Sequence, residues 1–213
     1  MTEDRLSRLG PLCGLLFVAL GLAGTAIGSA GGRAMVTLGD SNAKIVAAFA
    51  DPVGMGAWIG AYLELLSLPV FAVFAAWLFR SQRGVLGRIG MLGAASYLAV
   101  ITLSLVIGDV LSYQSGRGLS AQTILALFDL QAGLFAVSWG IAGGILAIAP
   151  VTGWLRRAAL AIAVLSFVGM AIPKAGPGQF AALLFVVWVL AASIGPMVRR
   201  RGAAATSPVA RPA

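Results

Sequence analysis

Six long apolar segments, separated by short stretches that hold most of the charged residues, dominate the 213-residue sequence. Each is close to or above the ~20 residues that an α-helix needs to cross ~30 Å of hydrocarbon. Charged residues make up only 10% of the chain. A soluble domain uses about 25% to cover its surface. The sequence therefore excludes a soluble globular domain, a coiled coil and a disordered chain, and it predicts an all-α polytopic membrane protein.

The apolar runs also set the limits of the six transmembrane helices that we expect. These are residues 12–30, 56–79, 89–110, 121–149, 155–172 and 180–198. The first run is far longer than the ~7–15 apolar residues of a signal peptide, so we expect it to stay in place as a span. Pro173 ends the fifth run, since proline cannot continue the helical hydrogen-bond ladder. Residues 1–201 then form one transmembrane domain, and residues 202–213, with little to bury, are expected to be a disordered tail.

The basic residues are distributed unevenly between the two sets of connections. With the N-terminus in the cytoplasm, eleven of them lie on the cytoplasmic side and four, Arg33, Lys44, Arg117 and Lys174, on the other. Short cytoplasmic loops carry such an excess of lysine and arginine. We therefore expect both termini to be cytoplasmic, in a multi-pass protein of the bacterial inner membrane. The net charge of +8 forms no basic stripe with interleaved aromatic residues, so we expect membrane lipids as partners and no nucleic acid.

Several chemistries are excluded because their residues are absent. The chain has no histidine, which excludes histidine-ligated haem, histidine-rich zinc sites and serine–histidine dyads. The single cysteine, Cys13, forms no internal disulfide or cysteine cluster. Neither a phosphate-binding loop ending in Gly-Lys-Ser/Thr nor an Asp-Asp-x-x-Asp motif occurs. We expect no metal site and no cofactor.

Three acidic residues, Glu64, Asp109 and Asp129, fall inside the expected spans. Charged groups at membrane depth are energetically unfavourable and often mark a functional site. Glu64 and Asp129 each lie eight residues from the outer end of their span, ~12 Å deep at 1.5 Å per residue. We expect both to face the bundle and to share a proton, with Asp109 lying at a shallower level. Alternatively, the acids are structural fasteners that pair with Arg33, Arg117 or Lys174 of the outer loops, or that are protonated and hydrogen-bonded to a carbonyl.

Other polar and aromatic residues are expected near these acids. Hydrogen-bonding groups and one deep tryptophan are the candidates: Gln131, Ser67, Ser104, Tyr62 and Trp139. Trp139 lies deeper in its span than the other tryptophans, which indicates a pocket wall more than an interfacial anchor.

Two further patterns bear on packing. Residues 43–50 of the longest outer connection follow the cap candidates Asp40-Ser41-Asn42 and predict a short amphipathic helix, either at the interface or as a lid. Glycines four apart, Gly24/Gly28 and Gly56/Gly60 among them, predict close helix–helix contact. Packing within one bundle explains these pairs, and a homo-oligomer through the same faces stays open.

Three segments resemble a bacterial membrane-protein family, the domain of unknown function DUF4386. They are Gly39-Asp-Ser-Asn-Ala-Lys-Ile-Val-Ala-Ala-Phe49, Leu127-Phe-Asp-Leu-Gln-Ala-Gly-Leu-Phe135 and Gly153-Trp-Leu-Arg-Arg-Ala-Ala-Leu160. The resemblance covers residues 10 to 198. It implies six helices and no established activity. Members often carry a histidine shortly after the aspartate of the fourth span, where this chain has Gln131 or its neighbours.

Three functions fit these features. The first is binding or transport of a small or lipid-like molecule in an outward-facing pocket, with Glu64 and Asp129 as the proton-titrating pair. The second is a membrane enzyme that uses the same carboxylates as general acid and base on an apolar substrate, for example a cyclase. The third is a structural or accessory subunit without a ligand. The sequence leaves open which of these applies and what the ligand is.

Overall fold

The structure is a computed structural model that describes residues 3–82, 84–175 and 177–205. It consists of α1 (Glu3–Ala30), α2 (Asn42–Ala47), α3 (Met55–Phe79), α4 (Val85–Gln114), α5 (Ala121–Ile148), α6 (Trp154–Ala171), a short 3-10 helix η1 (Pro173–Ala175) and α7 (Pro177–Ala205). No strand occurs in these ranges, so the all-α class is confirmed. Each expected span falls on one long helix. Helix α7 runs four residues past the expected start of the tail, and residues 206–213 lie outside the described part.

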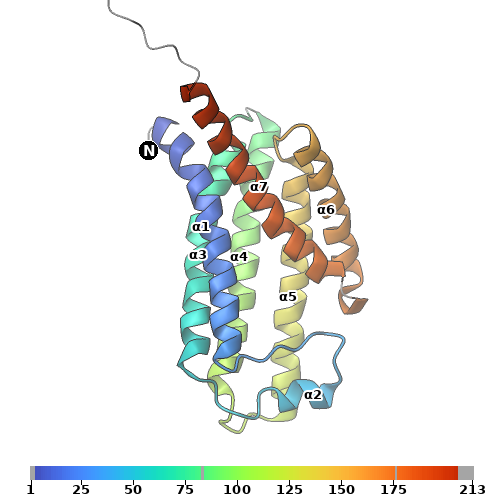
Figure 1. Ribbon diagram of the computed structural model, residues 1–213. Coiled ribbons are helices and arrows are strands. Elements are labelled where there is room, and N and C mark those ends of the chain that lie inside the picture. Colours follow the sequence, from blue (N-terminus) through green and yellow to red (C-terminus); the bar gives the residue numbers. More distant parts are fainter. Residues whose placement is uncertain (1–2, 83, 176, 206–213) are drawn as a thin grey trace, which may run out of the picture.

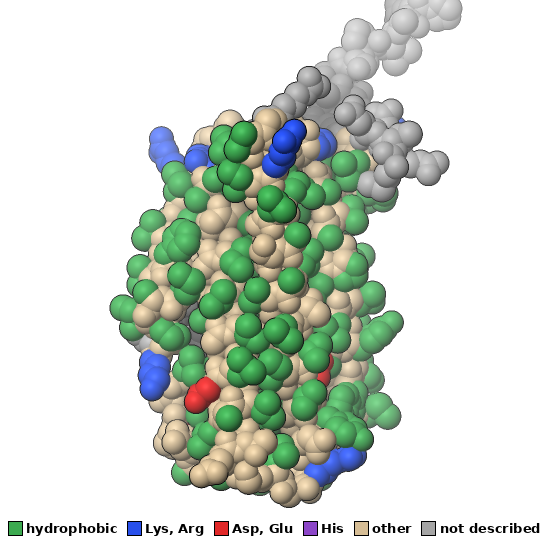
Figure 2. Space-filling view, turned by 180° about the vertical axis from the view of Figure 1, so that it is seen from behind, with side chains coloured by type: hydrophobic (Ala, Val, Ile, Leu, Met, Phe, Trp, Pro, Cys, Tyr) green, Lys and Arg blue, Asp and Glu red, His purple; other side chains and the backbone are tan. Residues whose placement is uncertain are grey.

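The helices have the length and surface of a multi-pass membrane protein. Five of them, α1 and α3 to α6, are long and apolar enough to cross a bilayer, and a shorter apolar stretch, Phe180–Gly195, lies in α7. Large apolar side chains such as Leu92, Val164 and Leu183 are exposed on the outer faces. Figure 2 shows this apolar surface between two ends where the charged side chains gather. Hydrocarbon chains would solvate such a surface, whereas water would not.

The six long helices form a closed ring. Along the ring, α1 packs on α3, α3 on α4, α4 on α5, α5 on α6, α6 on α7, and α7 returns to α1 (Figure 1). Both described ends of the chain lie at one end of the bundle, which we name the terminal end. The opposite end, where the connection from α1 to α3 and the short helix α2 lie, is the α2 end.

Aromatic side chains from five helices fill the centre of the ring. They are Phe17 of α1, Phe71 of α3, Tyr97 of α4, Trp139 of α5 and Phe185 of α7. The ring centroids of Phe71 and Phe185 are 6.0 Å apart, and those of Trp139 and Phe185 are 5.6 Å apart. Each of these side chains is at most 8% exposed. The bundle therefore has a packed core on its axis.

Glycine brings α1 and α3 into backbone contact towards the α2 end. A Cβ atom added to Gly60 would lie 2.5 Å from the carbonyl oxygen of Gly24 and 2.6 Å from Cα of Gly28. Only glycine lets the two helices approach this closely. The predicted contact of Gly24/Gly28 with another helix is confirmed, and the partner is Gly60 of the same chain.

Helix α2 covers the ends of α4 and α5. Its N-cap, Ser41, accepts a hydrogen bond from the backbone N–H of Lys44. Ile45 and, just after the helix, Phe49 are buried against Leu111 of α4 and against α5 residues that include Phe128. The segment predicted as an amphipathic helix is therefore a cap on the bundle.

Candidate functional site

An ion cluster of three residues lies near the α2 end, built around Arg33. Gly32, with φ 86°, follows α1 and turns the chain back, a conformation that glycine adopts without strain. The guanidinium of Arg33 donates to Glu64 of α3 at 2.6 Å and to Asp109 of α4 at 3.2 Å. The loop after α1 is thereby tied to two helices of the ring.

The three side chains of this cluster are largely shielded from solvent. The side chains of Arg33, Glu64 and Asp109 are 20%, 13% and 20% exposed. The hydroxyl of Thr25 on α1 donates a second hydrogen bond to Glu64, at 3.1 Å. The Glu64 side chain thus accepts two hydrogen bonds, one from Arg33 and one from Thr25.

The structure does not form the predicted pair of Glu64 and Asp129. Helix α4 packs between α3 and α5, so the two acids lie on helices that are not neighbours in the ring. Asp129 is exposed, and it forms no ion pair within the described residues. On the side of α5 that carries Asp129, an added Cβ would meet Met170 of α6 at Gly140 but nothing within 4 Å at Gly133 or Gly144.

The other predicted polar residues also differ in burial and in the groups that they contact. Ser104 is buried and donates to the backbone carbonyl of Gln131 at 2.9 Å, which joins α4 to α5. Ser67 is buried but donates to the backbone carbonyl of Glu64, not to its carboxylate. Tyr62 is 66% exposed and therefore points away from the bundle. Of these residues, Gln131 lines a cavity.

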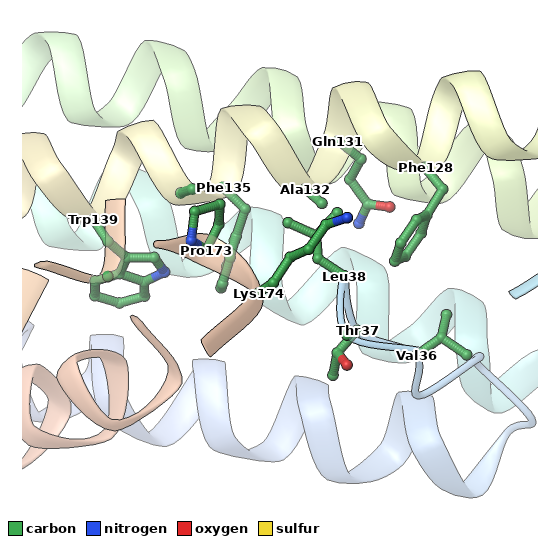
Figure 3. A pocket seen from close by; sticks show the side chains of 13 residues that line it. Val36, Thr37, Leu38, Phe128, Gln131, Ala132, Phe135, Trp139, Pro173 and Lys174 are labelled. Atoms are coloured by element: carbon green, nitrogen blue, oxygen red, sulfur yellow. The ribbon is translucent and has the colours of Figure 1, made fainter. Parts of the chain in front are cut away.

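A pocket with a volume of about 410 Å³ lies beside α5. Its walls are residues 36–39 of the loop after α1, one face of α5 from Phe128 to Trp139, Gly169 of α6, and Pro173 and Lys174 of η1 (Figure 3). The α6–α7 turn reaches only part of the way along α5 (Figure 1). The pocket therefore lies at the side of the bundle, in the notch that the short α6 leaves. We call it the α5 pocket.

Most of the wall of the α5 pocket is apolar, and a few polar groups point into it. Aromatic and aliphatic side chains such as Leu38, Phe128 and Phe135 form the apolar part. Lys174 is the one charged residue in this wall, and Gln131 supplies an amide close to it in Figure 3. Trp139 is 7% exposed, and its indole N–H has no hydrogen-bond partner in the structure.

A smaller cavity of about 90 Å³ connects the two features. Arg33 and Asp109 of the ion cluster line it, and so do Val36, Phe128 and Gln131, which also line the α5 pocket. The ion cluster is therefore positioned to hold the loop that forms one wall of the pocket.

Two residues of this region were not in the predicted site. The sequence indicates Arg33 and Lys174 only as orientation signals and as two of three alternative partners for an acid. Both are basic residues that adjoin the ends of apolar runs. A basic residue next to a span that carries an expected site residue was therefore the sequence signal that could have identified them. The position of Arg33 depends on the turn at Gly32, and that of Lys174 depends on where the short α6 ends. Local sequence patterns do not predict that these two features lie close to the same face of α5.

The chain matches no family model, no curated protein and no solved structure. Its function must therefore be argued from the ion cluster and the α5 pocket alone.

Proposed function

We propose that this multi-pass membrane protein binds a small, lipid-like molecule in the α5 pocket. The carrying observation is a pocket of about 410 Å³ whose wall combines apolar and aromatic side chains with Lys174, Gln131 and an unpartnered indole N–H. Ligand sites are typically concave and mostly apolar, with a few polar groups that orient the ligand. Their volumes are about 300–1,000 Å³.

The position of the pocket supports a ligand that arrives from the bilayer. Phe135, in the pocket wall, is 38% exposed, and Pro173 and Lys174 are exposed as well. The neighbouring surface of α5 includes Leu130, which is 52% exposed. An amphiphile dissolved in the membrane could enter here without crossing the bundle. The aromatic core on the axis supports binding over conduction through the centre.

The geometry gives less support to an enzyme that uses Glu64 and Asp129 as an acid–base pair. General acid catalysis needs a proton donor within reach of the substrate. Glu64 is held by Arg33 and Thr25, and Asp129 lies outside the pocket wall. In our proposal the ion cluster is a fastener that fixes the loop carrying Val36 and Leu38.

Filling the pocket tests this proposal. Ala132 lies in the pocket wall and is half-buried, so Ala132→Trp would occupy the ligand volume. Gly133 is the next residue, is exposed, and has open space where a side chain would start, so Gly133→Leu is the matched control. We expect lipid retained by the purified protein, measured by native mass spectrometry, to be lost in Ala132→Trp and kept in Gly133→Leu. Equal lipid retention in both variants would contradict the proposal and favour an accessory subunit without a ligand.

We further propose that both termini face the cytoplasm of a bacterial inner membrane. The excess of basic residues at the terminal end supports this orientation. In a Cys13→Ser background, an impermeant maleimide applied to intact cells should label Gln122→Cys, at the α2 end, and not Thr152→Cys, at the terminal end. Labelling of Thr152→Cys alone would reverse the orientation. Membership of the DUF4386 family stays part of the proposal, resting on the three segments given above.

A further inference from the structure

We infer that the ligand of the α5 pocket is an anionic lipid that carries an ester or amide carbonyl along its length. This inference rests on the proposed function and specifies the chemistry of the molecule. Two polar groups in the pocket wall carry it, Lys174 and the indole N–H of Trp139.

Lys174 supplies an unbalanced positive charge. No acidic residue lines the α5 pocket, and Lys174 forms no ion pair within the described part of the chain. Asp40, which follows the wall residues 36–39, is bound instead by Lys44 and by Thr37. Asp129 does not line the pocket. A phosphate or carboxylate would neutralise the Lys174 ammonium, and a charge-assisted hydrogen bond at this position is stronger than a neutral one.

The indole N–H of Trp139 is the second polar group, and it requires a hydrogen-bond acceptor on the ligand. The ring of Trp139 packs against Tyr97, Phe135 and Phe185, which fixes the indole in place. In Figure 3 the indole nitrogen lies on the side of the ring that faces Phe135 and Pro173. Leaving a buried N–H without an acceptor is unfavourable by about 1–3 kcal/mol. A bound ligand with a carbonyl oxygen at this point would remove that penalty.

The placement of the two groups limits the ligand. Lys174 and Trp139 line the same pocket, and in Figure 3 they lie at different points along its α5 wall. A free inorganic anion is too small to meet both groups. A fatty acid has acceptors only at its head. An acylated lipid with an anionic head group has one acceptor at its end and another along its length, with apolar chains for Phe135 and the membrane-facing surface.

Native mass spectrometry of the purified protein with three probe lipids tests the inference. The probes are dioleoylphosphatidylglycerol, its ether-linked analogue without carbonyls, and dioleoylphosphatidylcholine. For the native sequence we expect the ester phosphatidylglycerol to bind about tenfold more tightly than the phosphatidylcholine. Of these two lipids, only phosphatidylglycerol carries a net negative charge that can pair with Lys174. It should also bind more tightly than its ether analogue.

Substitutions test which residue causes the head-group preference and which causes the preference for ester over ether lipid. Lys174→Gln should bind the two head groups equally, and Lys174→Arg should keep the preference for phosphatidylglycerol. Lys44→Gln is the matched control, because Lys44 is an exposed lysine of the same end that pairs with Asp40 and does not line the pocket. Trp139→Phe keeps an aromatic ring without the N–H, and it should bind ester and ether lipids alike.

The outcomes separate this inference from the proposed function. If Ala132→Trp abolishes binding of all three lipids but the native sequence shows no head-group preference, the pocket is real and the inference is wrong. If Lys174→Gln keeps the full preference for phosphatidylglycerol, the assignment to Lys174 is wrong. If Ala132→Trp changes the binding of no lipid, both proposals are wrong.

Discussion

The guanidinium of Arg33 lies 2.6 Å from the carboxylate of Glu64, although the two residues belong to a loop and to the middle of a membrane helix. The turn at Gly32 makes this contact by directing the chain back towards α1. The same guanidinium reaches Asp109 on α4. One cation therefore links the first outer loop, α3 and α4, and holds the residues that follow it, including Val36, against α5.

Removing Arg33 should destabilise the bundle. Arg33→Gln leaves two largely buried carboxylates with one cation fewer, and breaking such a pair from one side lowers the free energy of unfolding by about 3 kcal/mol. Thermal unfolding of the detergent-solubilised protein would measure the change. Arg117→Gln is the control, because Arg117 lies 4.1 Å from the ring centre of Tyr113 and forms no ion pair in the described residues. Its loss should lower stability by about 0.5 kcal/mol.

A double substitution tests whether the ion cluster acts as a fastener. Arg33→Gln with Glu64→Gln removes one carboxylate together with the cation, so part of the stability lost in Arg33→Gln should return. Residues in direct contact show non-additive effects of this kind. Strictly additive losses would contradict the pairing of Arg33 with Glu64.

Replacing Asp129 by leucine should change the free energy of unfolding in the opposite direction to replacing Glu64. Asp129 is exposed on a membrane helix and has no ion-pair partner within the described residues. Because an unpaired charge in this environment is unfavourable, Asp129→Leu should raise the free energy of unfolding by about 1–2 kcal/mol. Glu64→Leu should lower it, since Arg33 and Thr25 lose their acceptor. A thermal-shift comparison of the two variants checks both signs, and a destabilised Asp129→Leu would show that Asp129 has a structural partner.

The close approach of α1 and α3 should depend on Gly60. In Gly60→Ala the new Cβ would lie 2.5 Å from the carbonyl oxygen of Gly24, so the helices must separate. We expect a loss of about 1–3 kcal/mol, typical of overpacking. Gly133→Ala adds the same methyl group in open space, and there the better helix propensity of alanine should give a gain of up to about 1 kcal/mol. Equal effects of the two substitutions would contradict the packing.

Low pH should destabilise the loop before α2, because Asp40 becomes protonated. Hydrogen bonds from the Lys44 side chain and the Thr37 backbone lower the pKa of Asp40 below its usual value of 3.8. A lowered pKa in the folded state stabilises the loop above the usual value, and this contribution is lost as the pH falls through the lowered pKa. After correction for intrinsic rates, amide hydrogen exchange in residues 37–47 should be constant from pH 7 to pH 5 and rise below pH 3.8.

Asp40→Asn provides the comparison for this experiment. It should exchange faster than the native sequence at pH 7 and lose the acid-dependent step. Asp51→Asn, an exposed acid of the same connection without an ion pair in the described residues, should keep the step. Retention of the step in Asp40→Asn would show that another group controls the loop.

How far the sequence predicted the site can be seen from its residues. The prediction that Glu64 and Asp109 lie inside spans, and the alternative that they pair with a basic residue of the outer loops, follow from the sequence, but the choice of Arg33 over Arg117 and Lys174 does not. The pairing of Glu64 with Asp129 failed because equal depth on two helices says nothing about their order around a ring, and α4 lies between them. Asp129 was expected to face the bundle, but it is exposed on α5.

By itself, the sequence determined that this chain forms six apolar helices, because segment length and hydropathy are local properties that the hydrocarbon thickness selects directly. It also determined the asymmetry of basic residues between the two ends. The tertiary structure alone decided which helices are neighbours, which acid Arg33 binds, and that a pocket forms where α6 stops short of α5. Those relationships join residues far apart in the sequence, and they depend on how side chains of different volume pack around one aromatic core.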